Sequence, residues 1–394
     1  MSSIPQTEYP LNTASPSPTE EQNHSRVKDY ITNTLSNLLT ELCSPDGHPS
    51  ITVKPRSTKV STRFINPQTG ALETHVSEAC TTYTWPGKDC YEAWRFTVAM
   101  RVLSGIADAV DKGVVVSKSR DIYYNDPAIF GSQRIVDRLV DDFAHTVGVD
   151  RTALNVGAAA KGLVVGCFQW RIQDPAMVDD AHFFNPDTLV PRPQDIQGLE
   201  VSDIEWVLIL EKEAVYRRLA GMNYHVRSMA GLGILVTGKG YPDLNTRAFI
   251  RRLYDESRRR QASKRIRFYA LVDGDPDGMG IMSTYKYGSL AYAHENSALN
   301  CPDIQWLGLR TSDIVAGVDP SGNDALLSLT ERDRKKILAM LSNNPVWAVD
   351  GPEQEARAEL LQMLMLNVKA EMQILYDGDG GLVRWLDRRM THFP

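Results

Sequence analysis

The chain has 394 residues, an ordinary globular composition and a formal net charge of −6, and its length suits about two or three domains. The acidic balance excludes a protein that binds nucleic acid through uniform positive charge, so any such contact must be local. Five cysteines without a CxxC spacing indicate neither a zinc site nor a disulfide framework, and they favour a reducing compartment. We find no apolar run long enough to span a membrane and no signal-peptide pattern, so no membrane association is expected.

The N-terminal part predicts a tail followed by a small extension. Residues 1–25 are rich in Ser, Thr, Pro, Asn and Gln and are expected to form a disordered tail. Apolar residues repeat at helical spacing over residues 27–42, which predicts an amphipathic helix whose stripe packs within this chain or against another subunit. Residues 50–85 alternate as strands do, with a turn at 66–70. The expected extension, a helix and a β-hairpin, covers residues 26–88.

The next segment has the pattern of a winged-helix domain, predicted for residues 89–190. Apolar residues at helical spacing predict one helix that ends at Gly113 and another over residues 132–147. Short strands separated by glycines over residues 154–172 would form the β wing of a helix-turn-helix module, which commonly docks on DNA. Lys161 lies in this predicted wing, where it could contact a phosphate; the alternative is a solvated lysine.

A different pattern follows the polar connector at residues 173–200. Short apolar runs separated by helices predict four strands, at Trp206–Leu210, Leu232–Val236, Phe268–Val272 and Ile304–Leu307. Strands that alternate with helices argue for a mostly parallel sheet. We expect this α/β domain over residues 198–394, with C-terminal helices at 332–341 and 353–375.

Acidic residues follow two of the predicted strands. Glu211 ends the first strand, and Asp273 and Asp275 end the third. Ligands of open α/β sheets bind beyond the carboxyl ends of the strands, so these side chains are expected to converge. Three hard oxygen ligands suit Mg²⁺ better than zinc. The alternative is a set of loop-end acids without a metal; Asp277 could be a ligand or a turn former, and Glu213 is a weaker candidate.

Two partial motifs in this domain are rejected. Asp273–Gly278 fits the first half of an EF-hand loop, but its twelfth position is Thr284, where a bidentate Glu is needed. Gly233–Lys239 nearly matches a phosphate-binding P-loop, but the next residue is Gly240, which lacks the hydroxyl that binds Mg²⁺. We therefore expect no nucleotide hydrolysis by this chain.

Positive charge gathers between the second and third strands. Residues 247–267 hold nine Arg or Lys residues on an apolar-striped helix and the turn after it, which is the best candidate for an electrostatic contact with DNA; a solvated helix face is the alternative. Tyr241 lies in a glycine-rich turn near the expected metal site, where it could stack on a sugar or press into the minor groove, or be an ordinary buried tyrosine. Lys161 and Arg247 would flank the same groove.

A candidate nucleophile precedes these features. Ser117 and Ser119 are good N-cap residues and predict a helix on which Arg120 and Tyr124 share a face. A tyrosine hydroxyl has a pKa near 10, and a neighbouring guanidinium would favour the phenolate and bind a phosphate. Tyr123 is three residues from Arg120 and could meet it too, so spacing alone does not choose between the tyrosines. One ring in the core and one at the surface is the non-catalytic alternative.

The stretch Arg120–Tyr124, with Lys118 before it and Phe130 after it, resembles the catalytic motif of the topoisomerase VI A-subunit family, which includes the eukaryotic proteins that make meiotic double-strand breaks. The resemblance continues in the family's order to the C-terminal helices, through four further segments: Val207–Glu213, Gly238–Asp243, Leu271–Gly278 and Trp306–Gly308. It implies a fold class of α/β plus α+β, a winged-helix (CAP-like) DNA-binding domain followed by a Toprim domain with a Rossmann-like parallel sheet.

The resemblance also implies a mechanism. Tyr124 would attack a DNA phosphorus and remain on the 5′ phosphate, Arg120 would stabilise the developing charge, and Glu211, Asp273 and Asp275 would bind Mg²⁺. One tyrosine cuts one strand, so a double-strand break needs a homodimer in which each tyrosine works with the partner's metal site. Family members imply a B-type partner and meiotic accessory proteins, and the Ser/Thr/Pro-rich tail favours a nuclear, chromosomal protein.

Three functions remain open from the sequence: a meiotic break-forming transesterase, a topoisomerase VI A-type chain that reseals DNA with an ATPase B-type chain, and a non-catalytic DNA-binding scaffold.

Overall fold

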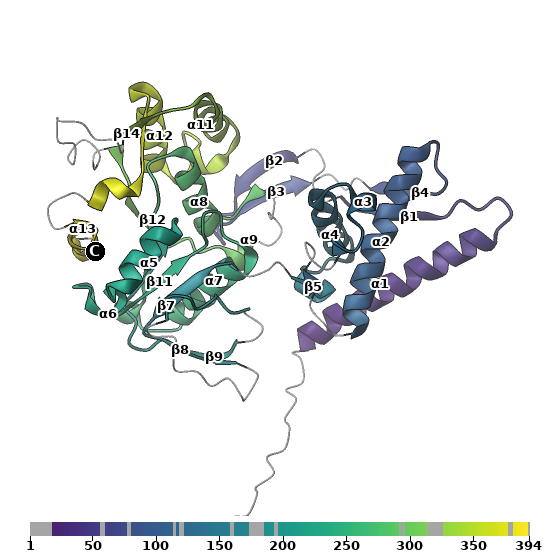
Figure 1. The fold of residues 1–394 in the computed structure, drawn as a ribbon, viewed down its shortest axis with the longest axis horizontal. Coiled ribbons are helices and arrows are strands. Elements are labelled where there is room, and N and C mark those ends of the chain that lie inside the picture. The colour runs from purple at the N-terminus through teal and green to yellow at the C-terminus, as the bar shows by residue number, and fades with distance from the viewer. Residues whose placement is uncertain are drawn as a thin grey trace, which may run out of the picture. The chain divides into compact units, whose positions relative to one another are not determined.

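The structure is a computed structural model that describes residues 18–55, 60–76, 80–112, 116–117, 122–157, 161–172, 185–192, 196–290, 293, 296–311, 313, 326–376 and 381–392. The chain forms two compact units (Figure 1). The first takes the described residues up to 55 and from 80 to 157, and the second takes 60–76 and those from 161 onward. No helix within these described ranges is long and apolar enough to cross a membrane.

The first unit is mainly helical. Its elements are α1 (Pro18–Cys43), β1 (Ser50–Val53), β4 (Thr81–Thr84), α2 (Cys90–Lys112), β5 (Val116–Ser117), α3 (Pro127–Phe130), α4 (Gln133–Val147) and β6 (Val156–Gly157). Its core joins apolar side chains of α1, α2 and α4 with those of the β1–β4 pair. The three predicted helices are confirmed as α1, α2 and α4, although Gly113, the predicted end of the second, lies outside the described residues. Gly148 caps the C-terminus of α4 in the left-handed conformation.

Two expectations for this unit are wrong. Helix α1 begins at Pro18, so residues 18–25 are helical and do not belong to a disordered tail; residues 1–17 lie outside the described ranges. Ser117 does not cap a helix, because it lies in β5, which pairs in parallel with β6. Residues 123–125 form a turn, so Tyr124 does not lie on the predicted helix.

The second unit is built on a five-stranded sheet of order β13–β12–β10–β11–β7, in which β7 spans Leu163–Gly166. The four parallel strands are β10 (Trp206–Leu210), β11 (Gly233–Thr237), β12 (Arg267–Leu271) and β13 (Gln305–Gly308). They coincide with the four predicted strands within one residue or so, which confirms the predicted parallel sheet. Both faces are buried, so these strands read as continuous apolar runs.

Helices cover the two faces of the sheet. Side chains of α7 (Leu244–Arg258), α8 (Pro276–Lys286), α11 (Glu331–Asn343) and α12 (Gln354–Leu366) pack with Val207 and Ile209. Side chains of α5 (Glu213–Gly221), α6 (Tyr224–Arg227) and α13 (Gly381–His392) pack with Leu208 and Leu210 on the other face. Short pairs complete the unit: β2 (Val60–Ile65) with β3 (Leu72–Val76), β8 (Gln169–Ile172) with β9 (Ile196–Glu200), and β14 (Leu326–Ser328) with β15 (Val368–Ala370); α9 spans Asn296–Leu299.

The predicted β wing is a further correction. Strand β7 (Leu163–Gly166) pairs antiparallel with β11 and extends the central sheet, and all four of its residues are buried. An apolar run of this kind satisfies its hydrogen bonds inside a sheet, whereas a wing strand has a solvated face. The β2–β3 hairpin also belongs to the second unit, where Leu72 is part of the core, so residues 26–88 are not one extension.

Candidate active site

The tyrosine turn of the first unit is anchored by Ile122. This side chain is buried against α2, where a Cβ on Gly105 would lie 3.1 Å from its Cγ1 atom, so glycine allows the close approach. Tyr123 is half-buried, and its ring lies 6.4 Å from that of Phe130. Tyr124 is 64% exposed and meets Tyr123 edge-on at 5.2 Å. The anchor therefore turns Tyr123 toward the core and Tyr124 toward solvent.

Arg120 lies outside the described residues, so its relation to either tyrosine stays a prediction. Near the turn, the Arg101 guanidinium on α2 lies 3.4 Å from the Asp126 carboxylate, in an exposed ion pair.

The acids of the second unit converge at the carboxyl ends of β10 and β12. Leu210 pairs with Leu271, and beyond this pair the Glu211 Oε2 atom accepts the backbone N–H of Asp273 at 2.8 Å. Asp275 caps α8, because its Oδ1 atom accepts the backbone N–H of Gly278 at 2.7 Å. Glu211 and Asp273 are both buried. The predicted convergence of these two elements is thus present in the structure.

Burial and mutual repulsion make these carboxylates hard to ionise. Burial, followed by the charge of Asp273, raises the pKa of Glu211 to about 8. Burial also raises the pKa of Asp273 and of Asp275, although each accepts a backbone hydrogen bond. A cation beside them would remove part of this electrostatic cost.

Lys212 already supplies one positive charge at this edge. Its Nζ atom lies 2.9 Å from Asp273 Oδ2 and 3.0 Å from Glu371 Oε2, and the other Asp273 oxygen accepts the Met372 N–H at 2.8 Å. Within the described ranges, no three acidic, His or Cys side chains are arranged around one point as a formed metal site would require. The donor chemistry of Glu211, Asp273 and Asp275 nevertheless fits a hard divalent cation.

The backbone around the acids is close-packed. A Cβ on Gly278 would lie 2.4 Å from the carbonyl oxygen of Asp273 and 3.1 Å from Glu211 Oε2. The Gly240 N–H donates to the carbonyl oxygen of Glu211 at 2.9 Å, which brings the loop after β11 beside the acids. Only glycine at position 278 therefore lets the first turn of α8 approach the Asp273 loop.

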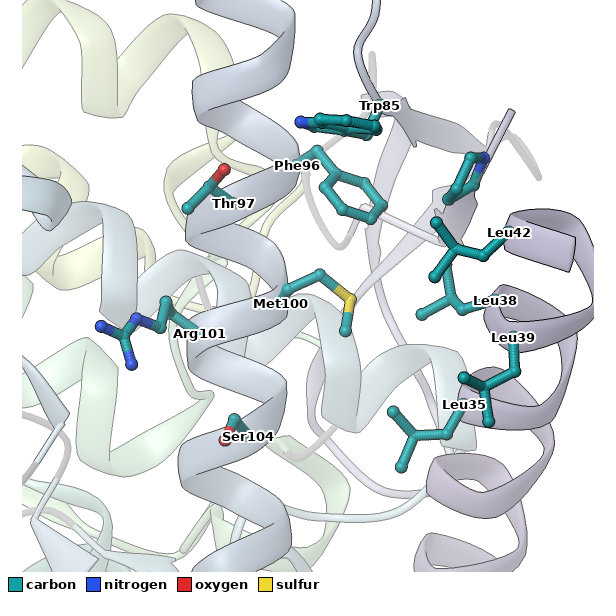
Figure 2. Close-up of a pocket in the computed structure, with 11 residues that line it drawn as sticks. Leu35, Leu38, Leu39, Leu42, Trp85, Phe96, Thr97, Met100, Arg101 and Ser104 are labelled. Atoms are coloured by element: carbon teal, nitrogen blue, oxygen red, sulfur yellow. The ribbon is translucent and has the colours of Figure 1, made fainter. Parts of the chain in front are cut away.

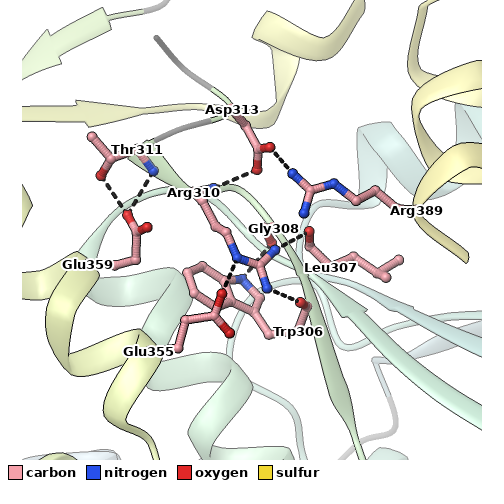
Figure 3. Close-up of polar contacts among 9 residues, drawn as sticks. All are labelled: Trp306, Leu307, Gly308, Arg310, Thr311, Asp313, Glu355, Glu359 and Arg389. Carbon is pink, nitrogen blue, oxygen red and sulfur yellow. Dashed lines mark hydrogen bonds and ion pairs between the residues drawn. The ribbon is translucent and has the colours of Figure 1, made fainter. Parts of the chain in front are cut away.

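A polar network fixes the end of β13 next to the acid loop. Leu309 donates its N–H to the carbonyl of Val272 at 2.8 Å. Figure 3 shows how the following Arg310 is held: its guanidinium donates to the Trp306 and Leu307 carbonyls at 2.9 and 2.7 Å and to Glu355 of α12 at 2.6 Å. Asp313, which accepts the Arg310 N–H, also contacts Arg389 of α13. The C-terminal helices thereby hold the strand end that flanks Val272 and Asp273.

The predicted DNA-contact residues separate into two groups. Lys161 and Tyr241 lie together: Lys161 Nζ donates to the carbonyl of Tyr241 at 2.7 Å, and the Lys161 N–H donates to Asp243 Oδ2 at 3.0 Å. Tyr241 is 44% exposed, so the buried alternative for it is wrong.

Arg247 must be corrected. It is 1% exposed, and its Nη2 atom donates to Asn296 Oδ1 at 3.1 Å inside the second unit. A side chain so placed reaches no phosphate, so the expected DNA contact at Arg247 is wrong. Two exposed neighbours at the end of α7 form ion pairs with acids: Arg258 with Asp303, and Arg259 with Glu256.

Two lysines were missed in the sequence analysis, one beside the acids and one beside Tyr241. Lys212 follows Glu211 directly, and its position next to a predicted ligand was a usable signal. Lys336 of α11 contacts Asp277 and donates to the Tyr241 hydroxyl at 2.9 Å. Lys336 and Tyr241 are far apart in sequence, and no local pattern indicates their contact.

The first unit also carries an apolar groove between α1 and α2, with a volume of about 680 Å³. Figure 2 shows leucines of α1 facing Phe96 and Met100 of α2, with Trp85 at one end. The leucines that line it are Leu35, Leu38, Leu39 and Leu42, and three of them are exposed. The predicted amphipathic stripe of α1 therefore has a buried part and an open part.

Comparison with known proteins identifies the class. The family model for the Toprim domain of the topoisomerase 6 A-subunit/Spo11 proteins matches residues 206–381, and one described as type IIB DNA topoisomerase matches residues 94–156. The chain is 32% identical to the meiotic recombination protein SPO11 of Homo sapiens, covering 89% of this chain and 83% of that protein. It is 31% identical to the meiotic recombination protein rec12 of Schizosaccharomyces pombe, over 89% of this chain and 91% of that protein. It is 34% identical to the DNA topoisomerase 6 A-subunit of Arabidopsis thaliana, over 71% of this chain and 61% of that protein.

The parallel sheet with acids at its carboxyl edge is a Toprim domain, in a type IIB topoisomerase-like enzyme. The chain belongs to the topoisomerase 6 A-subunit/Spo11 family, which confirms the resemblance found in the sequence.

The close packing at Gly278 gives a prediction. Gly278→Ala should lower the free energy of unfolding by about 1–3 kcal/mol, because the added methyl group displaces the Asp273 loop, and it should reduce DNA cleavage by more than the loss of folded protein explains. Gly221→Ala is the matched control, because no heavy atom lies within 4 Å of a Cβ there. Urea unfolding and cleavage assays measure both effects; wild-type stability in Gly278→Ala would contradict the geometry.

Proposed function

We propose that this protein is a DNA-cleaving transesterase whose double-strand breaks initiate meiotic recombination. The observation that carries the proposal is the match to meiotic recombination proteins over most of the chain, together with an exposed Tyr124 and the convergent acids. A non-catalytic scaffold would have no need of either chemical group. The nucleus, and within it the chromosome, is the corresponding location.

In the proposed reaction, the Tyr124 oxygen attacks a backbone phosphorus of DNA. The phenol loses its proton, the bond from phosphorus to the 3′ oxygen breaks, and that oxygen takes up a proton to leave a 3′ hydroxyl. One phosphodiester replaces another, so cleavage needs no ATP. Exposure leaves Tyr124 accessible to a backbone, and Arg120 would stabilise charge on the phosphorane.

Glu211, Asp273 and Asp275 would hold Mg²⁺, which supplies positive charge near the leaving oxygen when bound. The raised pKa values of these acids support this role, because a divalent cation offsets the repulsion between buried carboxylates. Each tyrosine cuts one strand, so two chains are needed, and the tyrosine of one chain would work with the acids of the other.

Lys161 and Tyr241 would contact the DNA. An ammonium has three N–H donors, and the Tyr241 carbonyl takes one from Lys161, which leaves donors for a phosphate. The exposed Tyr241 ring would press against a sugar or into the minor groove. The helices of the first unit would serve as a helix-turn-helix module that docks on the duplex.

The groove between α1 and α2 would receive a helix of a topoisomerase VI B-like subunit. One relative is named as the A-subunit of DNA topoisomerase 6, a name that denotes a multi-subunit enzyme. The exposed leucines repeat along α1 at helical spacing, opposite apolar side chains of α2, which is the shape that an amphipathic helix fills. Meiotic accessory proteins would join this complex.

The second candidate is the A-type chain of a topoisomerase VI, favoured by the 34% identity to that protein of Arabidopsis thaliana. The two functions differ in resealing: a topoisomerase rejoins the ends, whereas a break-forming protein stays attached to them.

Tyr124→Phe should abolish covalent attachment to DNA and leave the fold and DNA binding intact, because only the nucleophilic oxygen is removed. Tyr123→Phe is the control and should retain cleavage. Covalent complexes, isolated after denaturation from meiotic cells that express each variant, measure the effect. Recovery of the linked peptide at Tyr123 would overturn the assignment.

Asp273→Asn and Glu211→Gln should each remove cleavage and weaken Mg²⁺ binding without unfolding the protein. Glu213→Gln is the control, because Glu213 pairs with Arg217 and Lys239 and lies outside the proposed ligand set. Titration calorimetry with Mg²⁺ and cleavage assays test this. Normal cutting by Asp273→Asn or Glu211→Gln at limiting Mg²⁺ would exclude these residues as essential ligands.

Leu39→Asp should prevent co-purification with a co-expressed topoisomerase VI B-like subunit, because it places a charge in the open part of the groove. Asn37→Asp adds the same charge to an exposed position of α1 that does not line the groove, and should leave the complex intact. If the two variants behave alike, the partner binds elsewhere.

A further inference from the structure

Lys336 of α11 joins two groups at the rim of the acid site. Its Nζ atom contacts Asp277 Oδ1 and donates to the Tyr241 hydroxyl at 2.9 Å, and it lies 5.3 Å from the centroid of the Tyr241 ring. Arg332, one helical turn earlier, lies 3.8 Å from the other carboxylate oxygen of Asp277. The Asp277 carboxylate is thus engaged by cations of α11 on both oxygens.

The sequence left open whether Asp277 is a metal ligand or a turn former, and its ion pairs with α11 indicate a structural role. A carboxylate held by two cations is poorly suited to be a further metal ligand, since the cations would have to be displaced first. Asp277 lies in the first turn of α8, two residues after the capping Asp275. It therefore connects α11 to the turn that presents a proposed metal ligand.

Tyr241 is held at both of its ends. Lys161 donates to its backbone carbonyl at 2.7 Å, and Lys336 donates to its hydroxyl. A Cβ on Gly280 would lie 2.4 Å from the Tyr241 hydroxyl oxygen, so α8 accommodates the phenol only because a glycine stands there. The ring is nevertheless 44% exposed. A side chain fixed in this way loses little rotamer freedom when it contacts a ligand.

We propose that Lys336 is a positioning residue that fixes the Tyr241 ring and ties it to the acid loop through Asp277, and so determines where along the DNA this protein cuts. This proposal rests on the proposed DNA-cleaving function. The ring contacts the DNA, whereas Lys336 acts through the ring. Removing the Lys336 contact therefore changes the choice of cleavage position more than the chemistry at the phosphorus.

The test maps covalently linked 5′ ends by sequencing, in meiotic cells that express each variant of the full chain. Lys336→Met keeps the length of the side chain but removes its charge and its donors, and Tyr241→Phe removes the matching hydroxyl. Since one hydrogen bond is worth about fivefold in an equilibrium, the share of events at strongly preferred sites should change by about that factor in each. The double variant should match Lys336→Met, because Tyr241→Phe breaks only the hydrogen bond that Lys336→Met already removes together with the Asp277 ion pair.

Lys335→Met is the matched control, because Lys335 is exposed on α11 and pairs with Glu331. It should give the wild-type pattern, and Lys336→Arg, which restores a charged donor, should shift the pattern back toward wild type. A wild-type pattern in Lys336→Met or Tyr241→Phe, or additive changes in the double variant, would overturn the proposal. Tyr241→Phe keeps the ring and serves as the test if Lys336→Met fails to fold. Absence of linked ends from the wild-type protein would instead refute the cleavage function itself.

Discussion

The second unit depends on the packing of buried carboxylates at one edge of a parallel sheet. The pairing of Leu210 with Leu271 brings Glu211 and Asp273 together whatever their charge, and Glu211 accepts the Asp273 N–H at 2.8 Å. Buried like charges are costly, and this cost is only partly offset by Lys212 and by backbone N–H groups. Burial and the charge of Asp273 therefore raise the pKa of Glu211. A divalent cation bound at this edge would reduce the same electrostatic cost.

The elements around Glu211 and Asp273 pack closely enough to hold these two acids together. Gly278 lets α8 approach the Asp273 loop, and the loop after β11 lies against Glu211 through the Gly240 N–H. The same loop carries Tyr241, so the aromatic ring that is proposed to contact DNA belongs to the framework that positions the acids. Lys336 of α11 contacts both this loop, at the Tyr241 hydroxyl, and the first turn of α8, at Asp277. Changes at Lys336 are thus expected to shift the Tyr241 ring more than the acids, which the strand ends hold in place.

Much of this arrangement could be predicted from the sequence, because strands buried on both faces are continuous apolar runs and acids at their ends must share an edge. The same rule applies to β7: Leu163–Gly166 is equally apolar, so its place in the central sheet could have been predicted, whereas the neighbouring glycines suggested a wing. Arg247 could have been placed correctly, since it lies three residues before Ile250 and seven before Tyr254, on the buried stripe of α7. The contact between Lys336 and Tyr241 could not be predicted, because these residues are 95 positions apart in the sequence. The tyrosine turn was mistaken for a helix because Ser117 suits a cap, whereas its strand pairing with Gly157 is non-local.

The central claim is that Tyr124 cleaves one strand with the help of acids on another chain. Co-expression of a Tyr124→Phe chain with a Glu211→Gln chain, each carrying a different tag, tests it directly. In a mixed dimer the intact tyrosine of the second chain faces the intact acids of the first, so the account predicts single-strand nicks with covalently bound protein carrying only the second tag. Neither variant expressed alone should produce them. Mixed dimers that bind DNA but form no covalent nicks, or nicks linked to the Tyr124→Phe chain, would contradict the account.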